Sequence, residues 1–334
     1  MSERDAIAWS EAEISALTAK VAALKASMAS VIIGQDQVIE SLIICLLAGG
    51  HALVEGVPGL GKTLLVKSLA QATDMQFRRV QFTPDLMPSD IVGTEILEEN
   101  TATRQREFRF QPGPVFTQVL LADEINRAPP KTQSALLEAM QERAVTFAGQ
   151  THALPQPFFV LATQNPIEQA GTYPLPEAQL DRFLLRIDVG YPSEDEEMAM
   201  VARTTHAGLQ SATPAMDAVS LLRLQLLVRD IEIGEHLLRY ATRLVRATRP
   251  QASRVASVVK HVGWGAGPRA GQALVLASKA RALMHGRLAV TRDDIGAMLL
   301  PVLAHRVLRN FEAEADGVAV ADILLALRAE IRPD

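Results

Sequence analysis

Cysteine is almost absent from this 334-residue chain, which contains only Cys45. A single cysteine excludes a disulfide framework and a cysteine-based zinc site, and it is typical of a protein from a reducing compartment. Aromatic residues make up only 4% of the chain, so stacking platforms for single-stranded nucleic acid are not expected. The formal net charge of −5 also disfavours a dedicated nucleic-acid-binding protein, although it leaves a local basic patch open.

Long hydrophobic runs are missing too. The longest apolar run, residues 41–50, is far shorter than the roughly 20 residues that span a bilayer. The first ten residues include Glu3, Arg4 and Asp5 and lack the apolar segment of a signal peptide. We therefore expect a cytoplasmic protein without membrane insertion. Hydrophobic residues nevertheless make up 48% of the chain, which is enough for a globular core, and the length predicts about two domains.

The two parts of the chain differ in pattern. Up to residue 190, helical patterns alternate with short apolar runs that are typical of buried strands, at residues 51–55, 77–82, 119–122, 158–163 and 183–189. This alternation predicts an α/β domain with a parallel sheet and helices on both faces. Beyond residue 190 the patterns are almost only helical. Residues 1–188 carry 15 Lys and Arg against 22 Asp and Glu, whereas residues 189–334 carry 18 against 16. We therefore expect domains at residues 1–190 and 191–334.

Two stretches interrupt the alternation in the first domain. Residues 90–110 and 144–154 each show alternating apolar and polar residues on both sides of a polar turn, which predicts two β-hairpins. They could be ordinary surface hairpins or devices of the protein's function.

A phosphate-binding loop is the strongest motif in the chain. The pattern G-x-x-x-x-G-K-[ST] is matched by Gly56, Val57, Pro58, Gly59, Leu60, Gly61, Lys62 and Thr63, between an expected strand and an expected helix that continues with Leu64. Glycines let backbone N–H groups surround phosphate oxygens, and the helix presents its positive end to them. Lys62 would reach the β- and γ-phosphates, and the Thr63 hydroxyl would bind Mg²⁺. The predicted cofactors are ATP and Mg²⁺.

Two carboxylates, Asp123 and Glu124, follow the apolar run at residues 119–122. They would lie at the carboxyl edge of the sheet, where α/β proteins bind ligands. Asp123 is suited to hold Mg²⁺, directly or through water. Glu124 is suited to act as the base for an attacking water. The alternative, that both only cap the next helix, is weak beside a phosphate loop.

Three further polar residues are candidates for the same chemistry. Asn165 ends the next expected strand and could orient the water, or it could serve only the turn before Pro166. Arg182 could project toward the nucleotide of a neighbouring subunit, or it could pair with Asp181 at the surface. Arg269 begins a helix of the second domain and could also reach a nucleotide.

Together these motifs resemble those of AAA+ ATPases and, more narrowly, of the MoxR family. The stretches that carry the resemblance are LVEGVPGLGKT (53–63), LLADEINRAPPKTQSALLEAMQE (120–142), FVLATQNPIEQAGTYPLPEAQLDRF (159–183), GPRA (267–270) and VTRDDI (290–295). The resemblance implies a sheet of strand order 5-1-4-3-2 and a C-terminal all-helical lid. It also implies that residues 90–110 are an insert in helix 2 and that residues 144–154 are a hairpin before the Asn165 strand.

The resemblance further implies roles for single residues. Asn165 would be sensor 1, Arg182 the arginine finger and Arg269 sensor 2. The segment 31–35, which includes Ile33 and Gly34, would pack the adenine.

Members of the family look like ring-forming, usually hexameric, chaperone-like ATPases. They often act on protein clients together with a partner that carries a von Willebrand factor A domain. The alternatives are a magnesium-chelatase-like motor subunit, a motor stimulated by nucleic acid, and a nucleotide-binding scaffold that scarcely turns over. Within a ring, Phe147 near the tip of the second hairpin would contact the client, unless it folds back onto its own domain.

Overall fold

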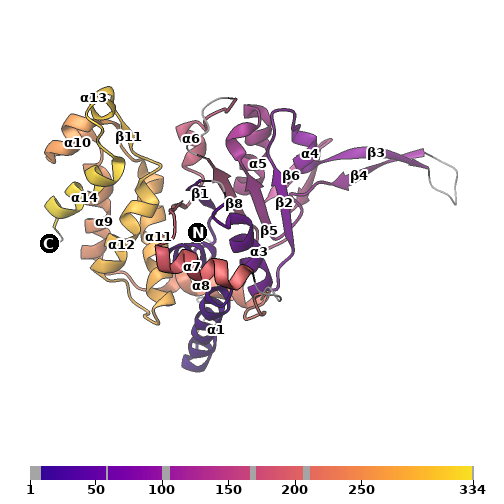
Figure 1. Cartoon of the computed structure of the whole chain (residues 1–334), viewed down its shortest axis with the longest axis horizontal. Helices are drawn as coiled ribbons and strands as arrows, with labels where there is room; N and C mark the ends of the chain where they lie inside the picture. Colours follow the sequence, from indigo (N-terminus) through magenta and orange to yellow (C-terminus); the bar gives the residue numbers. More distant parts are fainter. Residues whose placement is uncertain (1–8, 58, 100–105, 166–170, 206–210, 333–334) are drawn as a thin grey trace, which may run out of the picture.

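A five-stranded parallel sheet forms the centre of the first domain (Figure 1). The computed structural model describes residues 9–57, 59–99, 106–165, 171–205 and 211–332. The sheet strands are β1 (Ala52–Gly56), β2 (Phe77–Gln81), β5 (Val119–Asp123), β8 (Phe159–Gln164) and β9 (Leu185–Val189). Their spatial order is β2-β5-β8-β1-β9. Numbered among the sheet strands alone, this is the predicted order 5-1-4-3-2, which is therefore confirmed.

Helices cover the sheet on both faces. Alternate residues of its central strands point to opposite sides, and apolar residues on each side pack against these helices. Leu121 and Leu161 belong to the hydrophobic cluster that contains the helices α1 (Glu11–Ala29), α2 (Asp36–Leu47) and α3 (Lys62–Ala72). Leu120 and Val160 belong to a second cluster that contains α5 (Pro130–Glu142). Strands that are apolar on both faces are typical of a parallel sheet between two helical layers.

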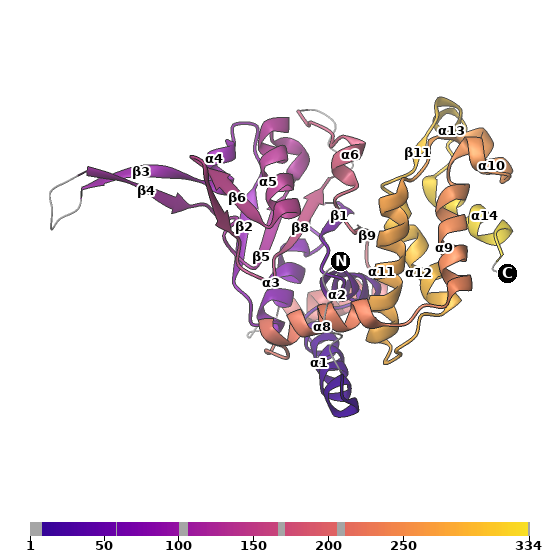
Figure 2. The same cartoon turned by 180° about the vertical axis from the view of Figure 1, so that it is seen from behind.

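Both predicted hairpins are present. One consists of β3 (Gly93–Glu99) and β4 (Arg106–Pro112), follows the short helix α4 (Pro88–Val92) and projects from the body of the protein (Figures 1 and 2). The other consists of β6 (Ala144–Phe147) and β7 (Gln150–Ala153). Its two turn residues, Ala148 and Gly149, have φ angles of 47° and 79°, as a type I′ turn requires.

Phe147, for which the sequence left open a client contact or packing against its own domain, has an apolar neighbour in its own domain. Phe147 is half-buried, and its ring centroid lies 5.6 Å from that of Phe110 on the first hairpin. Phe110 also stacks on His152 at 4.2 Å and meets Phe116 edge-on. The two hairpins therefore share an aromatic cluster, so the alternative that Phe147 folds back holds.

Helices dominate the chain after β9. The longer ones are α7 (Glu194–Thr204), α8 (Ala218–Asp230), α9 (Glu235–Ala247), α11 (Pro268–Met284), α12 (Arg292–Leu303) and α14 (Val320–Glu330). Short helices in this part lie at Pro250–Ala252 (η2), Ala256–His261 (α10) and Phe311–Ala315 (α13), whereas η1 (Ile125–Arg127) and α6 (Glu177–Leu180) precede β9. The resemblance implied an all-helical lid, but this part also contains two short strands. They are β10 (Val262–Trp264) and β11 (Leu308–Arg309), which form a short antiparallel ladder.

The C-terminal helices pack directly against the sheet domain. Helices α9, α11, α12 and α14 form a bundle at one side of the sheet domain, while α8 runs beneath the sheet domain (Figures 1 and 2). Residues of α2, β9, α11 and α12 belong to one hydrophobic cluster, which is continuous with the layer beneath the sheet. No helix among the described residues is both long and apolar enough to cross a membrane.

Candidate active site

The loop after β1 has the backbone geometry that a phosphate-binding loop needs. Gly59 and Gly61 have φ angles of 89° and 72°, and a side chain on either would meet open space. Gly56 is required for a different reason, because a Cβ there would lie 2.6 Å from the carbonyl oxygen of Val189. Val57 is half-buried, Leu60 is buried and Leu64 is exposed. Pro58 lies outside the described residues.

Lys62 and Thr63 begin α3, so the positive end of this helix faces the loop. The Lys62 ammonium donates to the carbonyl oxygen of Gly56 at 2.5 Å, which folds the side chain back over the loop. Burial lowers the pKa of Lys62 from its ordinary value, and the charges of Asp123 and Glu124 oppose that shift. The two carboxylates are therefore electrostatic neighbours of Lys62, although about 60 residues separate them in the sequence.

Thr163 on β8 fixes the acidic pair. Its hydroxyl donates to Asp123 Oδ1 at 2.6 Å and accepts the backbone N–H of Glu124 at 2.8 Å. Glu124 has a φ of 56°, a left-handed conformation that is uncommon for a residue with a Cβ and is concentrated at functional sites. This geometry turns the Glu124 side chain away from the strand direction while Asp123 stays at the strand end.

Two donors hold the Glu124 carboxylate. Gln81 Nε2, at the end of β2, lies 2.7 Å from Glu124 Oε2, and Arg127 Nη1 lies 2.9 Å from the same oxygen. Among the described residues no donor reaches Oε1, so this oxygen is available to take a proton from water. The sequence analysis missed Gln81, Arg127 and Thr163. The polar residues at the ends of β2 and β8 were the available signal, since parallel strands bring their carboxyl ends to one edge.

Arg79 is a further residue that the sequence analysis missed. Its guanidinium contacts Asp123 Oδ2 through Nη2 at 2.6 Å and through Nε at 3.1 Å. Arg79 is about half exposed whereas Asp123 is largely buried, so Arg79 can turn outward and leave Oδ2 to a cation. The Asp123 carboxylate and the Thr63 hydroxyl are hard oxygen donors, which fit Mg²⁺ when phosphate oxygens complete its coordination. No cluster of three acidic, His or Cys ligands occurs in the described part of the chain.

Asn165 and the segment around Gly34 lie next to the same edge. Asn165 is buried and directly follows β8, which lies between β1 and β5 in the sheet. It is therefore placed between the phosphate loop and the acidic pair. Ile33 is half-buried, and Gly34 is exposed with a φ of 69°. The adjacent Gln35 donates to the carbonyl oxygen of Leu60 at 3.2 Å, so this segment abuts the phosphate loop.

Arg182 and Arg269 lie at the opposite edge of the sheet. Arg182 precedes β9, whose Leu185 pairs with Ala52 at the start of β1. The length of β1, roughly 15 Å, separates Arg182 from the phosphate loop of its own chain. Arg182 and Arg269 line one cavity of about 200 Å³ together with His51, Met140, Gln141 and Asp181.

The two arginines differ in how they are held. Arg182 Nη1 donates to the carbonyl oxygen of Leu137 at 2.6 Å. The surface ion pair of Arg182 with Asp181 is not formed, since Asp181 pairs with Arg306 instead. Arg269 is exposed in the first turn of α11, and within the described residues it has no acidic partner. Arg269 is therefore a free cation beside Arg182 rather than beside Lys62.

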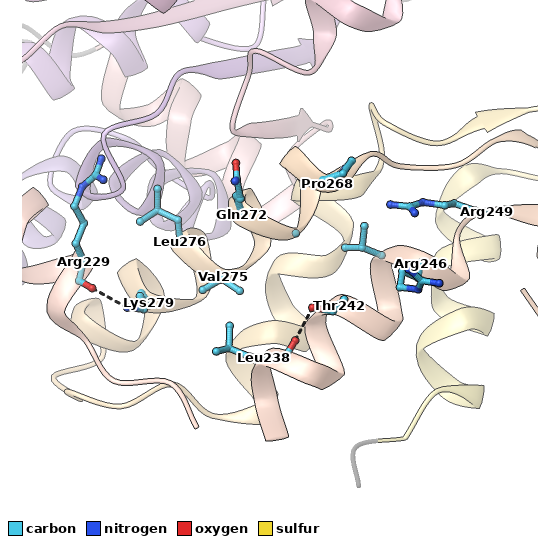
Figure 3. A pocket seen from close by; sticks show the side chains of 12 residues that line it. Arg229, Leu238, Thr242, Arg246, Arg249, Pro268, Gln272, Val275, Leu276 and Lys279 are labelled. Atoms are coloured by element: carbon cyan, nitrogen blue, oxygen red, sulfur yellow. Dashed lines mark hydrogen bonds between the residues drawn. The ribbon is translucent and has the colours of Figure 1, made fainter. Parts of the chain in front are cut away.

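A further cavity lies in the C-terminal part of the chain. It has a volume of about 770 Å³ between α9 and α11, and Figure 3 shows its lining. Four basic side chains surround an apolar floor: Arg229, Arg246, Arg249 and Lys279. None of its twelve lining residues belongs to the loop after β1 or to the ends of β5 and β8. This cavity is therefore separate from the candidate nucleotide site.

Comparisons with known proteins agree with this architecture. The family model described as "ATPase family associated with various cellular activities (AAA)" matches residues 51–185, and the model of the AAA lid domain matches residues 256–326. The chain is 46% identical over 290 residues to Chaperone MoxR1 of Mycobacterium tuberculosis, a match that covers 86% of this chain and 76% of that protein. The chain belongs to the MoxR family of AAA+ ATPases.

Other relatives extend the likeness to the MoxR family over nearly the whole chain. Protein MoxR of Paracoccus denitrificans is 34% identical over 301 residues, which cover 85% of this chain and 87% of that protein. A solved structure of a candidate ATPase from Cytophaga hutchinsonii is 39% identical, with a TM-score of 0.90, and the match covers 97% of this chain and 98% of that one. The fold expected from the resemblance to the MoxR family is therefore confirmed.

Proposed function

We propose that this MoxR-family protein is a Mg²⁺-dependent ATP phosphohydrolase whose active site is completed by a second copy of the chain. One observation carries the proposal. Five candidate residues converge on the carboxyl edge of the sheet: Lys62, Thr63, Asp123, Glu124 and Asn165. In contrast, Arg182 and Arg269 share a cavity at the amino edge. One protomer therefore offers a nucleotide site at one edge and two cations at the other.

The residues of the carboxyl edge divide the chemistry among them. Backbone N–H groups of the loop and the start of α3 bind the phosphates, and Lys62 turns from Gly56 to the β- and γ-phosphates. Thr63 and Asp123 would hold Mg²⁺, which neutralises phosphate charge when bound. Glu124 takes a proton from the attacking water through Oε1, because Gln81 and Arg127 hold Oε2. Asn165 orients that water from the neighbouring strand.

The residues of the amino edge act on the nucleotide of the next protomer. A transferred phosphoryl group carries charge that an arginine from a neighbouring subunit can stabilise. Arg182 supplies this charge, and Arg269, which lines the same cavity, supplies a second. A surface at one edge that contacts a different surface at the other edge is a heterologous interface, which forms a ring when the rotation between successive copies closes. We propose a ring of six copies.

The names of the relatives support a proposal for the biological role. Chaperone MoxR1 is named as a chaperone, which supports a role in remodelling or maturing protein clients. We further propose a partner with a von Willebrand factor A domain and a cytoplasmic location. Residues 1–190 would form the nucleotide-binding domain, with Ile33 and Gly34 against the adenine, and residues 191–334 the lid.

Replacement of Glu124 by Gln tests the proposed hydrolysis. The substitution keeps the size of the side chain and the contacts of the loop, so ATP should bind with an affinity within about threefold of wild type. Phosphate release should fall by about a hundredfold or more, since a general base contributes typically 10²–10⁴-fold. Lys62→Ala is the matched contrast, because it should weaken ATP binding itself. Equal loss of ATP affinity in both variants would contradict the role of Glu124.

A further inference from the structure

Arg306, which follows α12, is buried against the segment that carries Arg182. Its side chain is 4% exposed. Nε donates to Asp181 Oδ1 at 2.7 Å, and the guanidinium also contacts the backbone carbonyl oxygens of Asp181, Phe183 and Leu184 at 3.3, 2.6 and 3.2 Å. A further contact, to the carbonyl oxygen of Val302 at 2.5 Å, ties it to its own helix. Arg306 therefore holds the backbone on both sides of Arg182.

His305 strengthens the same attachment. Its Nε2 lies 3.1 Å from the carbonyl oxygen of Phe183, so the ring carries a proton on Nε2 and donates it. Burial holds the pKa of His305 well below its ordinary value, and the charge of Arg306 acts in the same direction. His305 is therefore neutral near pH 7. The charged groups of this attachment are Arg306 and Asp181.

A packing role alone does not account for this arrangement. Burial of a guanidinium is costly, and apolar residues of similar volume often stabilise a fold as well as a buried ion pair does. The planar fork of arginine, however, can bind several oxygens at fixed angles. Four of the five contacts of Arg306 are to the four-residue segment 181–184. This distribution is the one expected of a side chain that fixes the position of a backbone segment.

The C-terminal helices connect Arg306 with Arg269. Helices α11 and α12 pack against each other (Figure 1), and the fully buried Asp294 of α12 binds Arg281 of α11 and Arg287 at 2.6 Å each. Arg269 begins α11, and Arg306 follows α12. The two arginines that line the amino-edge cavity, Arg182 and Arg269, are thus attached to one pair of packed helices.

We propose that Arg306, paired with Asp181, is a positioning residue that couples the C-terminal helices to Arg182, so that Arg182 and Arg269 approach the neighbouring nucleotide as one unit. This inference rests on the proposed action of Arg182 on a neighbouring protomer. A shift of the lid would then move both cations together. Loss of Arg306 leaves every group of the protomer's own nucleotide site in place while it releases the backbone around Arg182.

The test uses Arg306→Met, with Arg306→Lys and Asp181→Asn as milder variants. Misplacement of a catalytic group by about 1 Å can cost about a hundredfold, so we expect kcat of Arg306→Met to fall by about tenfold to a hundredfold with the KM for ATP within about twofold. Arg306→Lys keeps the charge but loses the fork, and its kcat should lie between those of wild type and Arg306→Met. If Arg306→Met does not fold, the near-isosteric Asp181→Asn carries the same prediction with a smaller loss.

Two further measurements separate positioning from a structural effect. In an Arg182→Ala background, Arg306→Met should cause no additional loss of turnover, because its effect acts through Arg182. Mixing Arg306→Met with Glu124→Gln should restore turnover, since the Glu124→Gln protomer still presents a correctly held Arg182. Wild-type kcat in Arg306→Met and Asp181→Asn, or an Arg306→Met loss that mixing does not restore, would overturn the inference. Wild-type turnover of Arg182→Ala would instead overturn the proposed function.

Discussion

The two edges of the sheet differ in how their residues come together. At the carboxyl edge, most of the candidate residues follow directly from strands β1, β5 and β8, and they meet because parallel strands end together. At the amino edge, Arg182 and Arg269 come from segments about 90 residues apart, and the cavity that they line includes no residue of the phosphate loop. The first set forms the candidate nucleotide site of one protomer, whereas the second is proposed to act on the nucleotide of a neighbouring protomer. The difference supports the proposal that the unit of catalysis is a pair of protomers.

Removal of Arg182 is the largest expected perturbation of the amino edge. An arginine that acts on a neighbour's phosphoryl group contributes about 10³–10⁵-fold to kcat, so Arg182→Ala should lose about a thousandfold or more. ATP affinity should change little, because none of the described residues of the phosphate loop contacts Arg182. Lys131→Ala, an exposed cation on α5, is the matched control and should leave turnover unchanged. Similar kcat values for the two variants would mean that Arg182 contributes no more to turnover than an exposed surface cation does.

Removal of Arg269 should have a smaller effect. Arg269 has no acidic partner among the described residues, so Arg269→Ala should not alter the melting temperature by more than about 1 °C. It should lower kcat by about tenfold to a hundredfold through lost charge stabilisation in the neighbouring site. Gln272→Ala, on the next turn of α11 and also exposed, is the neutral control. A loss of ATP affinity with kcat unchanged would place Arg269 in its own protomer's site instead.

His51, at the amino edge, should contribute to the pH dependence of folding stability rather than add a positive charge to the cavity. Its Nδ1 accepts the backbone N–H of Val160 and its Nε2 lies 3.2 Å from the carbonyl oxygen of Met140. Burial lowers the pKa of His51 to about 4. The unfolded chain takes up a proton as pH falls below about 6.5, whereas the folded chain does not until about pH 4. Stability is therefore complete above pH 6.5 and falls as pH falls toward 4.

Urea unfolding at pH 7.5, 6.0 and 5.0 measures this contribution. Between pH 6 and 5 the slope for the wild type should exceed that for His51→Asn by about 1.2 kcal/mol per pH unit. The nearby His305 remains in both proteins, so it does not affect the difference. Parallel slopes would mean that His51 is protonated in the folded state and adds a third positive charge to the amino-edge cavity.

The sequence predicted the parts of the protein that depend on local pattern. The alternation of apolar runs and helices placed the strands, alternating residues around polar turns placed both hairpins, and glycine spacing placed the phosphate loop. The resemblance supplied the sheet order. The contacts that escaped prediction depend on register and long-range packing. Gln81 reaches Glu124, and Thr163 bridges Asp123 and Glu124, only because β2, β5 and β8 are neighbours in the sheet.

Residues far apart in sequence account for the other differences. Arg306 meets Asp181 across 125 positions, and nothing near either residue in the sequence indicates the other. Phe147 is beside a turn, where an aromatic side chain suggests exposure, but Phe110 of the other hairpin covers it. Arg269 could be assigned to a nucleotide from its motif, whereas the edge at which it lies comes only from the packing of α11 against the sheet domain.

The most direct test of the account is turnover in mixed assemblies of Arg182→Ala and Glu124→Gln protomers. Each variant alone should be nearly inactive, because every site lacks either the arginine or the base. Random mixing in equal amounts should create intact sites at roughly one quarter of the interfaces of a head-to-tail ring, and phosphate release should rise toward that fraction of the wild-type rate. A mixture no more active than the sum of its components would contradict the claim that neighbouring protomers share the active site.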